Sequence, residues 1–183
     1  DKDANIYVNG YKEEITVSNA LGNFYGTATF ALNDSTNTSE DYDTIYILDY
    51  ENAVVDSVNM TAGRVIMKEG SSISFGSNNT NVSSTLYDED GKEIEWSTLQ
   101  ENDILSIRKA KGNVSVNICT LVRNTVEGTI TERSSETDPD LVEFRIGGEY
   151  YKVDNQLVSP NDLGLNYEGV FYLDIFGRIA HYE

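Results

Sequence analysis

Few residues in this 183-residue chain have side chains suited to covalent catalysis. His181 is the single histidine and Cys119 the single cysteine. A Ser–His–Asp or Cys–His site would need His181, which falls on the last predicted strand, a poor place for a preorganised site. Cys119 lies within the apolar run VNICTLV, which is typical of a buried small side chain. We therefore expect no nucleophilic active site.

Paired carboxylates offer a second kind of chemistry, because glycosidases use two of them. The pairs that stand out are Asp88/Asp90, Glu93/Glu95 and Asp49/Asp174. A chain with 31 acidic residues contains many pairs by chance. Asp49 and Asp174 each follow a leucine just before a predicted turn, which favours a structural role in capping turn amides. We expect no catalytic residue, and we predict that the chain is not an enzyme.

The segment Asp88–Gly91 is similar to part of a calcium-binding loop. Lys92 stands where a calcium loop needs an oxygen ligand, and no bidentate glutamate follows at the right distance. A type I′ Asp-Gly turn explains the segment better. No cluster of cysteine and histidine is present that would hold zinc. We predict no metal site and no cofactor, and leave open weak calcium binding by clustered surface carboxylates.

Twelve tyrosines raise the possibility of carbohydrate binding, because aromatic faces stack on sugar rings. Four of them gather in the last third of the chain and are the possible glycan contacts: Tyr150, Tyr151, Tyr167 and Tyr172. Strand alternation places Tyr150 and Tyr151 on opposite faces, so only some of the four can share one platform. The alternative is that these rings pack in the core with their hydroxyls at the surface.

Charge limits the partners of the chain. It has 13 basic and 31 acidic residues, a formal net charge of −18. Such a surface repels nucleic-acid phosphates and anionic lipid head groups, so we expect no nucleic acid as a partner. No apolar run approaches the roughly 18 residues of a membrane-spanning helix, so we expect no membrane insertion. The acidic composition and the scarcity of cysteine fit a secreted or cell-surface location.

The composition predicts an all-β fold with little helix. Valine, isoleucine, threonine and tyrosine recur along the chain, whereas alanine and glutamine are scarce. Alternating apolar residues flank short turn-prone segments, which is the signature of β-hairpins. The predicted hairpins span residues 6–15, 45–56, 86–94, 105–116, 144–153 and 170–181.

These hairpins resemble one another in sequence. IYILDYENAVVD (45–56) aligns without gaps to VFYLDIFGRIAH (170–181), so Leu48 and Asp49 coincide with Leu173 and Asp174. We therefore predict two to three tandem small β-barrel or sandwich units built from hairpins. Their boundaries are 1–52 for a partial first unit, 53–124 for the second and 125–183 for the third. The expected core residues are Ile45, Ile47, Leu105, Ile107, Val170 or its neighbour Phe171, and Leu173.

Several segments resemble the β-modules of large secreted proteins of Gram-positive anaerobes that also carry S-layer homology domains. The similar segments are WSTLQENDILSIRKA (96–110), TVEGTITE (125–132), FRIGGEYYKV (144–153) and GVFYLDIFGRIAHYE (169–183). The resemblance covers roughly residues 43–183. It does not include the S-layer homology domains that bind wall polymer, so no wall-binding residue is carried over to this chain.

The resemblance implies an extracellular location in the cell wall or S-layer, and a role as a non-enzymatic spacer. Its partners would be neighbouring domains of the same surface protein. The alternative is a module that binds carbohydrate or cell-wall polysaccharide. Exposed coplanar aromatic rings would favour this alternative.

Overall fold

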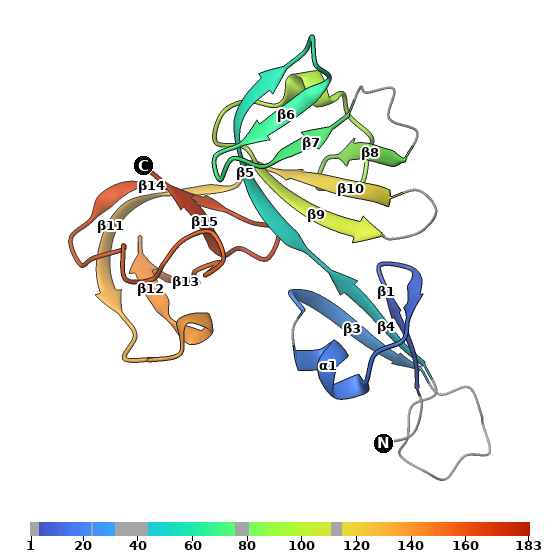
Figure 1. Cartoon of the computed structure of the whole chain (residues 1–183). Helices are drawn as coiled ribbons and strands as arrows, with labels where there is room; N and C mark the ends of the chain where they lie inside the picture. Colours follow the sequence, from blue (N-terminus) through green and yellow to red (C-terminus); the bar gives the residue numbers. More distant parts are fainter. Residues whose placement is uncertain (1–3, 23, 32–43, 76–80, 111–114) are drawn as a thin grey trace. The chain divides into compact units, whose positions relative to one another are not determined.

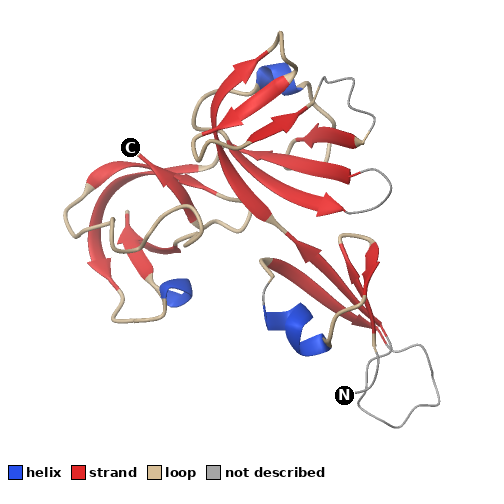
Figure 2. Ribbon diagram, viewed as in Figure 1, coloured by secondary structure: helices blue, strands red, loops and turns tan. Residues whose placement is uncertain are grey.

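The computed structural model describes residues 4–183 except 23, 32–43, 76–80 and 111–114 (Figure 1). Strands dominate this part of the chain, as Figure 2 shows. The helical elements among the described residues are α1 (Val17–Gly22) and the 3₁₀ helices η1 (Trp96–Thr98) and η2 (Pro139–Leu141). The predicted all-β class with little helix is confirmed.

The first sheet has four strands in the order β2-β1-β4-β3. Their bounds are Asn5–Val8 for β1, Tyr11–Glu13 for β2, Gly26–Ala31 for β3 and Thr44–Asp49 for β4. β1 pairs with β4 in parallel, whereas β1–β2 and β3–β4 are antiparallel. Ile6, Ile45 and Ile47 form a buried cluster with Ala20 of α1. The helix therefore covers one face of this sheet.

The second sheet has six strands in the order β7-β6-β5-β9-β10-β8. Their bounds are Glu51–Asn59 for β5, Arg64–Met67 for β6, Ser72–Ser74 for β7, Val82–Tyr87 for β8, Ile104–Ala110 for β9 and Ser115–Val122 for β10. β6 and β7 form a hairpin whose turn contains Gly70 at φ 89°. The left-handed conformation explains the glycine at this position.

The third sheet has five strands in the order β13-β12-β11-β14-β15. Their bounds are Thr125–Arg133 for β11, Glu143–Ile146 for β12, Glu149–Lys152 for β13, Glu168–Leu173 for β14 and Ile179–Tyr182 for β15. All of these pairs are antiparallel. The core against this sheet includes Ile130, Phe144 and Phe171, each fully buried.

The second and third sheets share one strand order. Each begins with a nine-residue central strand, β5 or β11. A two-strand hairpin follows on one side of it and two further strands lie on the other. Both central strands have a bulge where they meet the hairpin, between Val55 and Ser57 and between Ile130 and Glu132. The strand order of five strands is therefore repeated in the two sheets, and β8 is an additional edge strand of the second sheet.

The chain divides into two compact units. The first comprises Asp1–Glu51, Asn79–Ser83 and Ile107–Ile118, and the second comprises Asn52–Asn78, Ser84–Ser106 and Cys119–Glu183. Strands β8, β9 and β10 contribute residues to both units. The three sheets lie within residues 5–49, 51–122 and 125–182. The predicted domain boundaries at 52 and 124 remain a prediction.

Several predicted hairpins are present. Residues 6–15 contain β1 and β2, 144–153 contain β12 and β13, and 170–181 fall in β14 and β15. β9 and β10 are neighbours as predicted for 105–116, but the predicted turn at 111–113 lies outside the described residues. The predicted hairpin over 86–94 is also present, because Tyr87 pairs with Glu93 in an antiparallel bridge and the Ile94 amide donates to the Leu86 carbonyl.

The predicted hairpin over 45–56 is wrong. β4 and β5 belong to different sheets, and Tyr50 alone separates them. The two Leu residues of the gapless alignment differ accordingly, since Leu48 is 38% exposed and Leu173 is 9% exposed. A strand that leaves one sheet and enters the next keeps the alternation of a hairpin, so the apolar pattern alone does not separate the two cases.

The predicted core is confirmed. Ile45, Ile47, Leu105 and Ile107 are at most 2% exposed. In the 170–171 pair Phe171 is the buried member, and Leu173 is buried as well. Alternation therefore identified the inward faces correctly even where it misplaced a turn.

The different environments of the two aligned leucines predict different costs of truncation. Leu173→Ala removes a buried side chain and should lower the free energy of unfolding by about 2–5 kcal/mol. Leu48→Ala, the matched control, should lower it by about 1 kcal/mol or less. Chemical denaturation followed by circular dichroism measures both. Equal losses would contradict the burial difference.

Candidate functional site

Tyr150 is the most exposed of the four predicted glycan contacts, at 51%. Its hydroxyl donates a hydrogen bond to Glu132 of β11, and Arg145 of β12 lies 5.8 Å from its ring centroid. Arg145 also pairs with Glu132 at 2.6 Å. These hydrogen bonds lower the pKa of Glu132, that from Tyr150 most, and raise the pKa of Tyr150. The ring is thus held across three neighbouring strands.

The other three predicted tyrosines do not join Tyr150 in a platform. Tyr151 and Tyr167 are half-buried and pack against the core of the third sheet, Tyr167 edge-to-face with Phe171. Tyr172 packs against a different buried cluster, and its hydroxyl donates to Glu183 at 3.2 Å. Tyr150 and Tyr151 lie on opposite faces, as alternation predicts.

His181 pairs across the strands with Tyr172, and its side chain is 21% exposed. Its Nε2 atom is buried, lies 3.9 Å from a Glu183 carboxylate oxygen and has no hydrogen-bond partner in the described part of the chain. Burial, followed by the charge of Lys68, lowers the pKa of His181. Cys119 is fully buried, in agreement with the sequence. Neither side chain is arranged as part of a nucleophilic site.

The Asp88–Gly91 segment forms a turn of a different type from the one predicted. Asp88 accepts hydrogen bonds from the amides of Asp90 and Lys92. Gly91 has φ 79°, but Asp90 is not among the described residues with positive φ, so a type I′ turn is wrong. The Gly91 amide donates to the Asp88 carbonyl, which fits a three-residue loop with glycine at the left-handed position.

The predicted equivalence of Asp49 and Asp174 is also wrong. Asp174 caps its own turn, since its Oδ1 atom accepts from the amides of Phe176 and Arg178, both at 2.9 Å. Asp49 instead accepts from the amide of Tyr25 across its sheet. Only Asp174 has the predicted turn-capping role, because the chain does not turn after Asp49.

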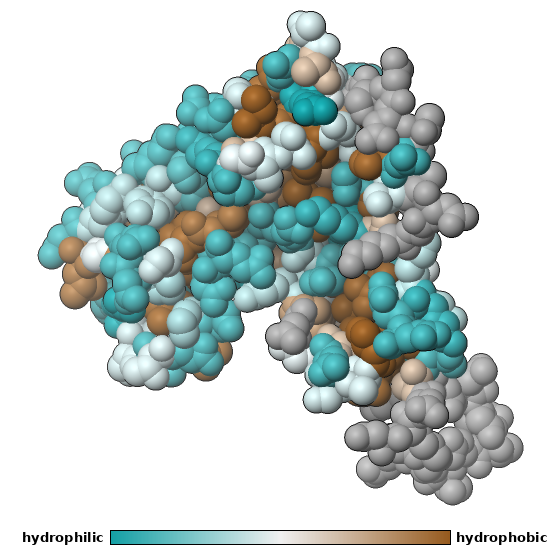
Figure 3. All heavy atoms as spheres, viewed as in Figure 1, coloured by the Kyte–Doolittle hydropathy of each residue, from teal (hydrophilic) through white to brown (hydrophobic). Residues whose placement is uncertain are grey.

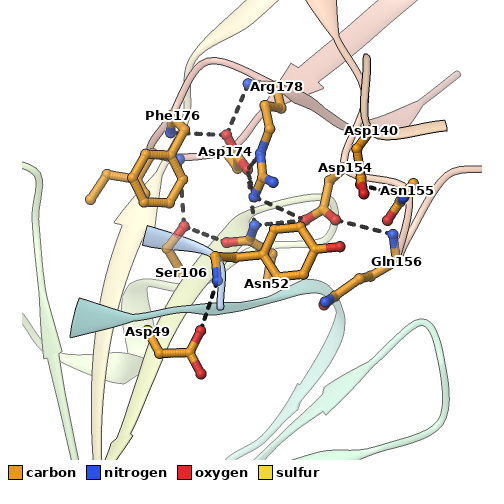
Figure 4. Close-up of polar contacts among 12 residues, drawn as sticks. Asp49, Asn52, Ser106, Asp140, Asp154, Asn155, Gln156, Asp174, Phe176 and Arg178 are labelled. Atoms are coloured by element: carbon orange, nitrogen blue, oxygen red, sulfur yellow. Dashed lines mark hydrogen bonds and ion pairs between the residues drawn. The ribbon is translucent and has the colours of Figure 1, made fainter. Parts of the chain in front are cut away.

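A buried polar site surrounds the side chain of Asn52, and Figure 4 draws its polar contacts. Asn52 lies on β5 and is 5% exposed. Its Nδ2 atom donates to Asp154 at 2.7 Å and to Asp174 at 2.9 Å. Its Oδ1 atom accepts from the hydroxyl of Ser106 on β9 at 2.6 Å. One amide therefore links the second sheet to two carboxylates beside the third.

The two carboxylates are almost inaccessible, each 1% exposed. The Arg178 guanidinium compensates part of their charge, with Nη2 2.7 Å from Asp174 and 3.6 Å from Asp154. The other oxygen of Asp154, Oδ1, accepts a hydrogen bond from the amide of Gln156. Two carboxylates and one guanidinium leave one net negative charge, which neutral donors must solvate in place of water. Asn52 supplies two of these donors.

This network, which we call the Asn52 network (Asn52, Ser106, Asp154, Asp174 and Arg178), is suited to structural cross-linking. Each carboxylate accepts several hydrogen bonds, and the Ser106 hydroxyl is committed to Asn52. Apolar side chains beside it, Val54, Ile104 and Ala180 among them, form one buried cluster from both sheets.

Sequence reasoning missed most of the Asn52 network. The predicted hairpin over 45–56 would place Asn52 near its turn, but Asn52 lies on β5 and directly precedes the buried apolar run Ala53–Val55. A polar amide next to three buried residues was the available signal. Asp154 and Ser106 had no distinguishing pattern, because their partners lie 102 and 54 residues away from them in sequence.

A second buried carboxylate, Asp103, precedes β9 and is 6% exposed. Arg123 makes two hydrogen bonds of 2.7 Å to its oxygens, which raises the pKa of Arg123. The amide of Gln100 donates to the same carboxylate. This bidentate pair joins the segments at the ends of β9 and β10.

The described residues contain neither a candidate metal site nor a candidate membrane-spanning helix. No group of three or more histidine, cysteine, aspartate or glutamate side chains is placed to hold a metal ion there. Of the helices described, none is long and apolar enough to cross a bilayer. Hydrophilic residues cover most of the coloured surface in Figure 3, with apolar residues in smaller patches between them.

Removal of the central amide tests the Asn52 network. Asn52→Ala would leave two buried carboxylates and one hydroxyl short of a partner, so we expect a loss of about 2–4 kcal/mol in the free energy of unfolding. Asn155→Ala removes a surface hydrogen bond from an asparagine to Asp140 and serves as the control, with a loss below about 1 kcal/mol. Similar losses for both variants would contradict a special role of the buried amide.

The lowered pKa of His181 predicts the direction of a pH effect. In the unfolded chain His181 takes up a proton at the usual histidine pKa near 6.5, whereas in the folded chain its pKa is lower. The stabilising contribution of neutral His181 is therefore complete above that value and is lost as pH falls below it. Because this is the only histidine, its ring resonances report the folded pKa directly, and His181→Gln should flatten stability over this range. A folded midpoint above 6.5 would contradict the effect of burial.

The chain matches no protein-family model, and neither the curated proteins nor the solved structures contain a significantly similar one.

Proposed function

We propose that this chain is a non-enzymatic spacer module of an extracellular cell-envelope protein. The observation that carries the proposal is the Asn52 network, which commits the most buried polar groups of the second compact unit to joining two sheets. Within the network these side chains are hydrogen-bonded to one another.

The repeated strand order supports the same role. Two successive sheets with one topology increase the length of a module without adding a new site. The acidic surface, with a net charge of −18, keeps such a module soluble and disfavours non-specific contacts with anionic polymers. The resemblance to β-modules of S-layer-associated proteins gives the proposed location. Wall-glycan binding remains the second proposal, and of the four tyrosines only Tyr150 offers a largely exposed ring for it.

A spacer can be replaced by another rigid β-module of similar length. In the source organism, we would exchange this chain within its parent surface protein for an unrelated β-module, and label intact cells with antibodies to a neighbouring domain. The proposal predicts equal labelling and unchanged adhesion or growth. Labelling of the original chain only after cell lysis would contradict the location. Normal display with lost adhesion would contradict the spacer role and indicate a specific ligand.

A further inference from the structure

A groove in the second compact unit has a chemistry that the spacer role does not use. It has a volume of about 340 Å³ and is lined by residues around β8 and the start of η1. A volume of this size lies within the usual range for small-molecule sites. Two aromatic rings, two carboxylates and two hydroxyls contribute to its wall, from Phe75, Trp96, Glu93, Glu95, Ser84 and Thr85.

Local structure holds the aromatic rings together. Phe75 follows β7 and is fixed by a hydrogen bond from its amide to the Gly63 carbonyl. Trp96 opens η1, whose last turn packs through the buried Leu99. The two ring centroids are 6.1 Å apart and the planes differ by 12°. Both rings are half-buried, so each keeps part of its surface open to solvent.

The two carboxylates enter the groove from a short return segment after β8. Glu93 bridges to Tyr87, and the Ile94 amide donates to the Leu86 carbonyl, so the segment runs antiparallel to β8. Glu93, Ile94 and Glu95 all line the groove, so this segment brings two acidic residues to its wall. Both glutamates are exposed, and their side chains make no ion pair or hydrogen bond with the residues that the structure describes.

The charge of the wall decides the class of ligand. The lining includes two carboxylates and no lysine or arginine, in a chain of net charge −18, so phosphates, sulfates and uronic acids are repelled. An uncharged sugar would gain nothing from this field. An organic cation is attracted by both parts of the wall, because aromatic faces attract quaternary ammonium groups and carboxylates attract any positive charge.

We propose that the groove formed by Phe75, Trp96, Glu93 and Glu95 binds the ammonium group of a small organic cation. The aromatic rings contact its methyl or methylene groups, and the two glutamates neutralise its charge. The site does not depend on the spacer function, because all of its residues lie on the surface of one compact unit.

Trp96 is the only tryptophan of the chain, so its fluorescence reports this groove directly. We would titrate the intact protein with choline, with its uncharged isostere 3,3-dimethyl-1-butanol, with phosphocholine and with methyl glucoside. The proposal predicts saturable binding of choline in the millimolar range, weaker binding of phosphocholine and no binding of the two neutral compounds. Tighter binding of phosphocholine than of choline, or equal binding of a neutral compound, would overturn it.

Variants separate the site from the general acidity of the chain. Glu93→Gln with Glu95→Gln should weaken choline binding roughly fivefold or more. Glu127→Gln with Glu168→Gln changes net charge equally at exposed positions on β11 and β14 and is the matched control. Phe75→Leu should weaken binding while it retains the Trp96 reporter, with circular dichroism to verify folding. Absence of choline binding, or equal loss in the control, would overturn the proposal.

Salt provides an independent measurement. The Debye length falls from about 30 Å at 0.01 M to about 8 Å at physiological ionic strength, so binding through charge should weaken over this range. Choline affinity that does not change with NaCl would overturn the assignment of Glu93 and Glu95 to charge neutralisation.

Discussion

The second compact unit depends on the solvation of two buried carboxylates without water. Moving a carboxylate into a protein interior costs several kcal/mol unless hydrogen bonds and opposite charge replace its hydration. Arg178 provides the opposite charge, and the Asn52 amide provides donors to both aspartates from a different sheet. Any separation of the two sheets would withdraw these donors. Separation of the two sheets therefore costs more free energy than the loss of the adjoining apolar contacts alone would cost.

The same geometry explains why this polar arrangement is specific. Apolar contacts such as those of Val54 and Ala180 tolerate small shifts, because dispersion depends weakly on direction. Hydrogen bonds of 2.6–2.9 Å around one planar amide fix both its position and its orientation. The apolar cluster thus supplies much of the attraction, and the Asn52 network selects one register between the sheets.

The sequence predicted the strands and their inward faces well, because side-chain alternation has a period of two wherever one face is buried. Ile45 and Leu105 are examples. It did not reveal that the chain passes from β4 to β5 without turning, because a hairpin and a continuing strand have the same alternation. Most contacts of the Asn52 network were not predictable, since Asn52, Ser106 and Asp154 are far apart in sequence and come together only in the folded chain. Glu93, Glu95 and Trp96 are neighbours in the sequence, whereas only folding brings Phe75 to the same groove.

The shared strand order affects how a chain of this kind can change in length. A duplicated segment carrying one sheet would bring its own central strand and hairpins. It would not bring both halves of the buried polar contacts, because Asn52 and Ser106 belong to one segment and Asp154 and Asp174 to the next. Insertion of a copy of one sheet between them would leave either a buried amide or two buried carboxylates without partners. Recombination that preserves the fold must therefore move the two sheets together, as one genetic cassette.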